Sequence, residues 1–171
     1  MSDGFVLMPG EGERISPAMT LKAGDGQSGS FSVFEVVDIE RGFDVGAHLH
    51  HNAEEMFYVL EGELDLLAFE PRVRTPTGWQ HWESHSGNKV ARGGPGSFMF
   101  VPQGCPHAFA NPGPGLARMI FLVSPPGHEH YQKELAELVA RATGPLDEAI
   151  GQLRAHYDIE QLTPQVVPRP H

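Results

Sequence analysis

Cysteine is almost absent from this sequence: Cys105 is the only one among 171 residues, so no internal disulfide can form. A chain of this length can bury a sizeable core without such cross-links. Basic residues are also few, 12 against 22 acidic ones, which gives a formal net charge of −10. Binding to nucleic acid needs a basic surface, so we expect no nucleic-acid partner.

Long hydrophobic runs are absent as well, and none approaches the length of a membrane span. The first residues, MSDGFVLMPGEGER, lack the basic and apolar regions of a signal peptide. With one unpaired cysteine, the simplest expectation is a cytoplasmic protein that does not associate with membranes. Nucleotide-binding glycine motifs and the GxSxG motif of hydrolases are missing too.

What the sequence does contain is a series of short strand patterns. The first 30 residues show little periodicity, and their apolar patches, Phe5–Met8 and Met19–Leu21, fit edge strands or an arm that crosses to a partner subunit. From Phe31 onward, alternating β-branched and aromatic segments follow one another between Gly- and Pro-containing turns. These segments are FSVFEVVDI, GFDVGAHLH, EMFYVLEG, ELDLLAF, GSFMFVP, HAFAN and LARMIFLVS. They predict an all-β antiparallel barrel or sandwich.

The C-terminal part changes to helical periodicity. Leu135, Leu138, Val139 and Ala142 share one helical face, and a second helix is predicted to start at Gly144–Pro145. The apolar stripe of the second helix consists of Leu146, Ile150, Leu153 and Tyr157. We therefore predict a single domain, residues 1–171, with a β core at about 30–125, a two-helix appendage at about 128–160 and an extended Pro-rich tail.

A polar insertion separates the fourth and fifth of these strands and carries Trp79 and Trp82. We expect the indoles to pack against the barrel wall or in a dimer contact, and a lid over the barrel mouth is the alternative. His81 and His85 in the same insertion are expected to be exposed.

Four residues stand out as metal ligands. His48 and His50 are two residues apart, so in an extended segment both imidazoles point to the same side. Glu55 follows after a short polar turn, and His107 follows a Pro/Gly turn in the second stretch, GSFMFVPQGCPHAFAN. Three imidazoles and a carboxylate suit one divalent transition metal: Fe, Mn, Co, Ni, Cu or Zn.

Neighbouring residues compete for this role. Glu54 adjoins Glu55, but strand parity with Phe57 and Val59 favours Glu55 and leaves Glu54 in solvent. His51 should point away from the pair. Cys105 is interpreted as a buried thiol outside the metal centre. His128 and His130 form a second HxH pattern, yet they open a helix, where positions i and i+2 face different directions. We interpret both as lid or surface residues.

These two stretches resemble the two signature motifs of the cupin superfamily. The first has the form G-x5-H-x-H-x4-E-x6-G and runs from Gly42 to Gly62. The second has the form G-x5-P-x-G-x2-H-x3-N and runs from Gly96 to Asn111. The resemblance implies a small antiparallel barrel, the double-stranded β-helix, with a metal held inside by His48, His50, Glu55 and His107, and it suggests a homodimer.

More loosely, the whole chain resembles the single-domain bacterial cupins described as quercetinase-like. The similar segments are SGSFSVFEVV, FYVLEGEL, SPPGHEHY and AHYDIEQLTP, whereas the insertion around Trp79–Gly94 departs from the compact form of that group. Inward-facing Phe57, Phe100 and Phe109 are expected to line an apolar pocket for a small organic substrate.

Three functions are compatible with this resemblance and ligand set. The first is a dioxygenase similar to flavonol 2,3-dioxygenases, in which Glu55 also accepts a substrate proton. The second is an isomerase, cyclase or lyase that uses the metal as a Lewis acid. The third is a non-enzymatic binding module, because the same barrel serves all three classes.

Overall fold

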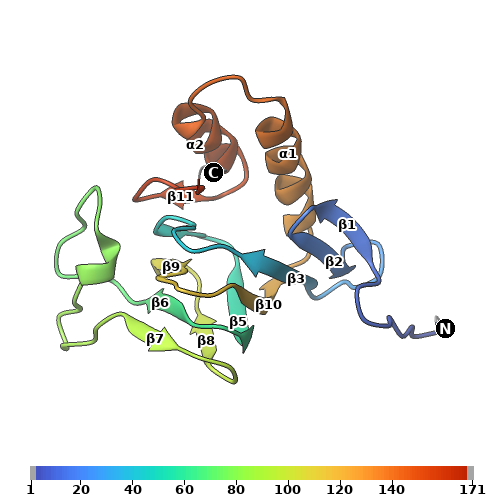
Figure 1. Ribbon diagram of the computed structural model, residues 1–171, viewed down its shortest axis with the longest axis horizontal. Coiled ribbons are helices and arrows are strands. Elements are labelled where there is room, and N and C mark those ends of the chain that lie inside the picture. The colour runs from blue at the N-terminus through green and yellow to red at the C-terminus, as the bar shows by residue number, and fades with distance from the viewer. Residues whose placement is uncertain (1–2, 169–171) are drawn as a thin grey trace.

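Two antiparallel β-sheets form the core of the computed structural model, which describes residues 3–168 (Figure 1). The larger sheet has the strand order β1–β2–β3–β10–β5–β8. Its strands are β1 Glu13–Ser16, β2 Met19–Ala23, β3 Ser32–Ile39, β10 Ala117–Ser124, β5 Glu54–Glu61 and β8 Phe98–Val101. The smaller sheet has the order β11–β4–β9–β6–β7. Its strands are β11 Glu160–Gln161, β4 His48–Leu49, β9 His107–Ala110, β6 Leu64–Ala68 and β7 Ala91–Gly93. The predicted all-β double-stranded β-helix with a helical appendage is confirmed.

Alternation along the strands places one face of the larger sheet in the core. In β10 every second side chain is buried, β5 follows the same rule, and β3 follows it as far as Val36. Three of the inward side chains are stacked phenylalanines: the ring of Phe121 lies 4.6 Å from that of Phe34 and 5.6 Å from that of Phe57. Burial of each ring stabilises the fold by about 1.5–3 kcal/mol. This stack forms an apolar wall beside the predicted metal ligands.

The insertion packs against the outside of the smaller sheet, where a short 3-10 helix, η1 Trp79–His81, anchors it. Trp79 and Trp82 are only 1% and 5% exposed. The indole of Trp79 donates to the Asp44 carboxylate at 2.9 Å, and that of Trp82 donates to the Thr75 hydroxyl at 2.7 Å. Small side chains make room for the rings: Ala47, Ala108 and Ala110 lie in the same cluster. The indoles therefore pack against the barrel wall, and His81 and His85 are exposed as expected.

The C-terminal helices are α1 His128–Arg141 and α2 Asp147–His156. In Figure 1 α2 lies above β11, and α1 lies beside α2 and next to β1. The second helix begins later than the predicted Gly144–Pro145 start. Neither helix has the length and apolarity needed to span a membrane. The predicted extended tail is attached to the barrel, because Val166 pairs with Asp44. Residues 169–171 of this tail lie outside the described part of the chain.

A buried arginine joins the appendage to the barrel. The guanidinium of Arg154, on α2, donates to the Tyr131 hydroxyl at 3.0 Å and to the main-chain oxygen of Val45 at 2.8 Å. A third bond, also 2.8 Å, reaches the side-chain oxygen of Gln165. Because buried polar groups are costly without partners, these bonds tie both helices and the last described residues to the barrel.

Candidate metal centre

The predicted ligands come together from both sheets. His48 lies on β4 and pairs in register with His107 on β9, while His50 follows β4 directly and Glu55 comes from β5 of the other sheet. All four side chains are buried, with exposed fractions of 8% or less. The ring centre of His107 is 4.2 Å from that of His48 and 5.1 Å from that of His50. Only His48–Leu49 form a regular strand here, and positive φ angles at Gly42 and Gly46 interrupt the longer strand that the sequence predicted.

Main-chain carbonyl groups set the tautomer of each imidazole. The Nδ1 atom of His48 lies 2.7 Å from the oxygen of Gly46, and that of His107 lies 3.1 Å from the oxygen of Cys105. The Nδ1 atom of His50 lies 3.2 Å from the oxygen of Asp158. A carbonyl oxygen only accepts, so each Nδ1 carries a proton and each neutral ring keeps a lone pair on Nε2. This is the arrangement by which protein groups orient histidines that bind metal.

The Nε2 atoms of His50 and His107 have no aligned hydrogen-bond partner among the described residues, although both atoms are buried. Glu55 lies close to both, with its oxygens 2.8 Å from His50 Nε2 and 3.3 Å from His107 Nε2. The two distances are those of ion pairs, but the angles at the nitrogen atoms do not suit hydrogen bonds. One donor atom from each of the three histidines falls within 4.8 Å of the others. Buried, unaligned nitrogen donors beside a carboxylate fit a transition-metal ion.

The electrostatics of the site favour the protonation states that metal binding needs at Glu55 and His48. Burial opposes ionisation of Glu55, but His50 and His107 outweigh it and hold the pKa of that carboxyl well below its usual value. Burial, with help from His107, lowers the pKa of His48 well below 6.5 and keeps that ring neutral. Burial of His50 also acts against its charged form, but the charge of Glu55 outweighs burial and raises the pKa of the His50 ring. A proton at His50 is therefore the main competitor of a metal ion.

The competing residues are separated as the sequence predicted. Glu54 and His51 are exposed, and their side chains lie away from the three buried imidazoles. Cys105, predicted to be buried, is only half-buried, and its partial burial raises the pKa of its thiol. Its main-chain oxygen, rather than its sulfur, serves the site by accepting from His107.

Two of the three phenylalanines predicted to line the pocket face the interior, and the pocket itself stays a prediction. Phe57 and Phe109 are buried at 4% and 8% exposure, and the ring of Phe57 lies 6.1 Å from that of His107. Phe100 is 51% exposed, so the prediction that it faces inward is wrong. Its neighbours Met99 and Val101 occupy the interior instead. In an alternating strand this register puts Phe100 on the outer face.

His128 belongs to this site although the sequence predicted a lid or surface position. Its ring lies 5.8 Å from the ring of His50 and 5.8 Å from that of Phe34. The first residue of α1 reaches this place because Val123, near the end of β10, pairs with Glu55 and brings the following turn to the metal end of β5. The spacing of the HxH pattern contains no signal for this position. His130, in contrast, is exposed and pairs with Asp25 at 2.6 Å.

The partly buried position of His128 predicts an acid-sensitive fold. Burial lowers its pKa from 6.5 to about 4. Between these values the unfolded imidazole binds a proton that the folded one does not, so stability falls as pH decreases and this residue contributes about 2–3 kcal/mol of the loss. We expect His128→Gln to flatten the dependence of unfolding free energy on pH between 6.5 and 4, measured by urea denaturation of metal-free protein. An unchanged slope would contradict this assignment.

Residues 10–149 match the family model described as Cupin, so the chain belongs to the cupin family. A search of curated proteins found no significant match. Among solved structures, the chain is similar to KdgF from Halomonas sp. at 17% identity, covering 68% of this chain and 89% of that one with a TM-score of 0.48. The protein TT1209 from Thermus thermophilus shows 22% identity, 66% and 89% coverage and a TM-score of 0.46.

A third structure is a putative sugar phosphate isomerase from Acidithiobacillus ferrooxidans, with 23% identity and a TM-score of 0.42. The match covers 56% of this chain and 50% of that one, so the chain spans about half the length of this protein. At such identities and TM-scores these structures indicate no particular activity for the chain.

Proposed function

We propose that this cupin is a metal-dependent dioxygenase of the quercetinase-like kind, acting on a small aromatic or enolisable substrate. The observation that carries the proposal is the buried set of three imidazoles with fixed tautomers beside the Glu55 carboxylate. A bound Fe, Mn, Co, Ni, Cu or Zn ion supplies a positive charge that lowers the pKa of a substrate hydroxyl and, where redox-active, a route for electrons to O2.

The residues of the chain would contribute three actions. His48, His50 and His107 would hold the ion through Nε2. Glu55, ionised because its pKa is low, would take part in binding and accept the proton of a substrate hydroxyl within hydrogen-bond reach. Phe57 and Phe109 would bound an apolar space that excludes water from the reacting atoms.

Oxygen uptake tests the proposal. The protein, loaded in turn with each candidate metal, is mixed with flavonol and catechol panels, and O2 consumption is followed. We expect uptake that depends on both metal and substrate. Turnover of a substrate without O2 consumption would replace the dioxygenase by a Lewis-acid isomerase, cyclase or lyase, since these reactions need no oxidant.

We also propose that two copies associate through apolar surface at the larger sheet. Tyr58, Phe98 and Phe100 project from the outer face of β5 and β8 with exposed fractions of 41–58%. The N-terminal segment Phe5–Met8 is exposed too and extends away from the body in Figure 1. The adjacent exposed aromatic side chains on β5 and β8 support a protein contact at this face.

For this dimer, the double variant Phe98→Ser/Phe100→Ser is expected to sediment as a monomer while the wild type sediments as a dimer. Val73→Ser serves as a control, because Val73 is 68% exposed but lies in the insertion. Analytical ultracentrifugation at several protein concentrations makes the measurement. A monomeric wild type would remove the proposed dimer.

A further inference from the structure

The chain that leaves α2 returns to the metal-binding loop. Asp158 adopts a left-handed backbone conformation with φ of 57°, and the following residues form β11. This strand pairs with β4, with Glu160 opposite Leu49 and Gln161 opposite His48. The C-terminal segment is therefore an added edge strand of the smaller sheet, next to a proposed metal ligand. Distant parts of the sequence are thereby brought into one site.

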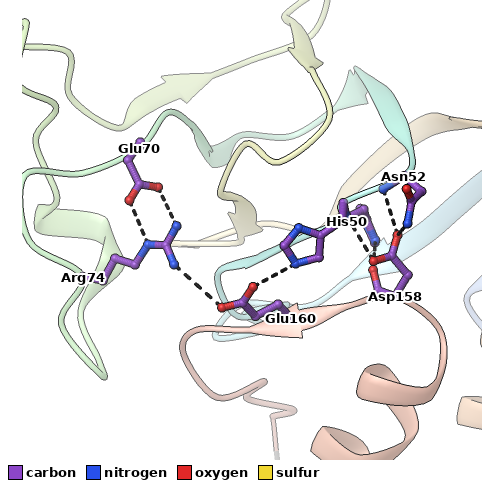
Figure 2. A network of polar contacts seen from close by, with 7 residues as sticks. His50, Asn52, Glu70, Arg74, Asp158 and Glu160 are labelled. Atoms are coloured by element: carbon purple, nitrogen blue, oxygen red, sulfur yellow. Dashed lines mark hydrogen bonds and ion pairs between the residues drawn. The ribbon is translucent and has the colours of Figure 1, made fainter.

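Asp158 contacts three successive residues of the loop (Figure 2). Its main-chain oxygen lies 3.2 Å from Nδ1 of His50. Its carboxylate accepts from the main-chain N–H groups of His51, at 3.2 Å, and Asn52, at 2.9 Å. A further bond of 3.3 Å comes from the Asn52 side chain. One residue thus orients the imidazole of a ligand and fixes the backbone that follows it.

We propose that Asp158 is a positioning residue of the metal centre, and that docking of the C-terminal segment and metal binding stabilise each other. This inference rests on the proposed metal site. The Asp158 carbonyl selects the Nδ1–H form of His50, which leaves Nε2 free to bind the ion. The left-handed backbone allows the carbonyl and the carboxylate of one residue to reach the same loop. Asp and Asn tolerate this conformation better than Ala.

Other bonds hold the same segment, so removal of the Asp158 carboxylate should leave it folded. The hydroxyl of Thr163 accepts from the main-chain N–H of Ala47 at 2.7 Å, and Ala47 in turn accepts from the main-chain N–H of Leu162 at 2.8 Å. Arg154 adds its bonds to Val45 and Gln165. A Cβ at Gly46 would lie 2.5 Å from the Thr163 oxygen, which shows how closely the two segments approach.

The ion pairs drawn beside Asp158 in Figure 2 provide the matched control. Glu160 contacts His51 at 3.1 Å and Arg74 at 3.8 Å, and Arg74 also pairs with Glu70. These side chains are 40% exposed or more, so their pairing contributes little free energy. Glu160→Gln removes a carboxylate two residues from Asp158 without touching the metal-binding loop backbone.

Three substitutions separate the two features of Asp158. Asp158→Asn keeps an acceptor oxygen and the tolerance for positive φ, Asp158→Gly keeps only that tolerance, and Asp158→Ala keeps neither. Co2+ affinity is measured by competition with a chelator, and the visible spectrum of the Co2+ protein reports the ligand geometry. We expect Asp158→Ala to weaken binding by about 10–100-fold and to alter the spectrum, as loss of a supporting group does. Asp158→Asn should restore most of both properties.

Hydrogen exchange tests the coupling itself. A ligand that binds only the docked state, present at about 100 times its Kd, lowers the population of the undocked state by about 100-fold. Co2+ should therefore slow exchange at the amides of Leu162 and Thr163 in the wild type and in Glu160→Gln. In Asp158→Ala the slowing should be smaller by about tenfold or more, in line with the weaker binding. Asp158→Ala could instead destabilise the protein and leave the Co2+ affinity, the spectrum and the slowing of amide exchange by Co2+ unchanged. Asp158 would then be structural only, and the inference would be wrong.

Failure of the metal site itself gives a different result. A wild type that binds no Co2+ at all would remove the proposed function as well as this inference. A wild type that binds Co2+, together with an Asp158→Gly variant of equal affinity and spectrum, removes only the role of the carboxylate. Because Asn and Gly both permit the backbone conformation, these two variants carry the test if the alanine variant does not fold.

Discussion

Replacement of His107 by Ala is expected to abolish metal binding while the protein remains folded. His107 is fully buried on β9 and supplies one of the three imidazoles, and its Nε2 makes no other aligned bond among the described residues. Loss of groups that merely support a ligand costs about 10–100-fold in affinity, so loss of a ligand itself should cost more than about 100-fold. Competition with a chelator measures the affinity, and circular dichroism verifies the fold.

The control is His51→Ala, which removes a neighbouring imidazole whose side chain is 60% exposed. We expect its metal affinity to equal that of the wild type within a factor of about three, since exposed ion pairs such as its contact with Glu160 are weak. Equal metal content in His107→Ala and the wild type would contradict the ligand assignment.

Replacement of Trp79 by Ala is expected to lower the unfolding free energy by about 3–5 kcal/mol, because it empties a buried site that an indole fills. The side chain is 1% exposed and its N–H donates to Asp44, which would lose that partner. Urea denaturation measures the loss. Metal affinity should be retained wherever the variant is folded, because the indole packs with Ala108 and Ala110 rather than with the metal ligands.

A lid would behave in the opposite way. If the insertion covered the barrel mouth without packing against the wall, Trp79→Ala would leave stability nearly unchanged and alter substrate turnover alone. Trp82→Phe is a milder companion: it keeps most of the apolar area and loses only the bond to Thr75. We expect it to cost about 1 kcal/mol, the typical worth of one hydrogen bond.

The sequence predicts the strands of the barrel core well, because their alternation and turn residues are local signals. It also predicts which carboxylate turns inward, since Glu55 shares the parity of Phe57 and Val59. Which residues of β8 face the interior could not be predicted in this way. All four of its residues are apolar, so hydrophobicity does not distinguish the inner face from the outer one.

The support of the site is less predictable than its ligands. The two-residue strand β11 forms because the chain returns from α2 to the edge of β4. No local sequence pattern predicts such a pairing. The roles of Asp158 and His128 follow from the same return and from the turn after β10. Both are contacts between distant parts of the chain, which only the folded topology creates.

The claim that three histidines and Glu55 form a metal centre is tested most directly by metal content. The full chain is purified without a metal-binding tag, and inductively coupled plasma mass spectrometry measures all first-row transition metals per polypeptide. The account predicts about one equivalent of a single transition metal, retained through dialysis at neutral pH. Absence of metal, both in the purified protein and after incubation with each candidate ion, would contradict it.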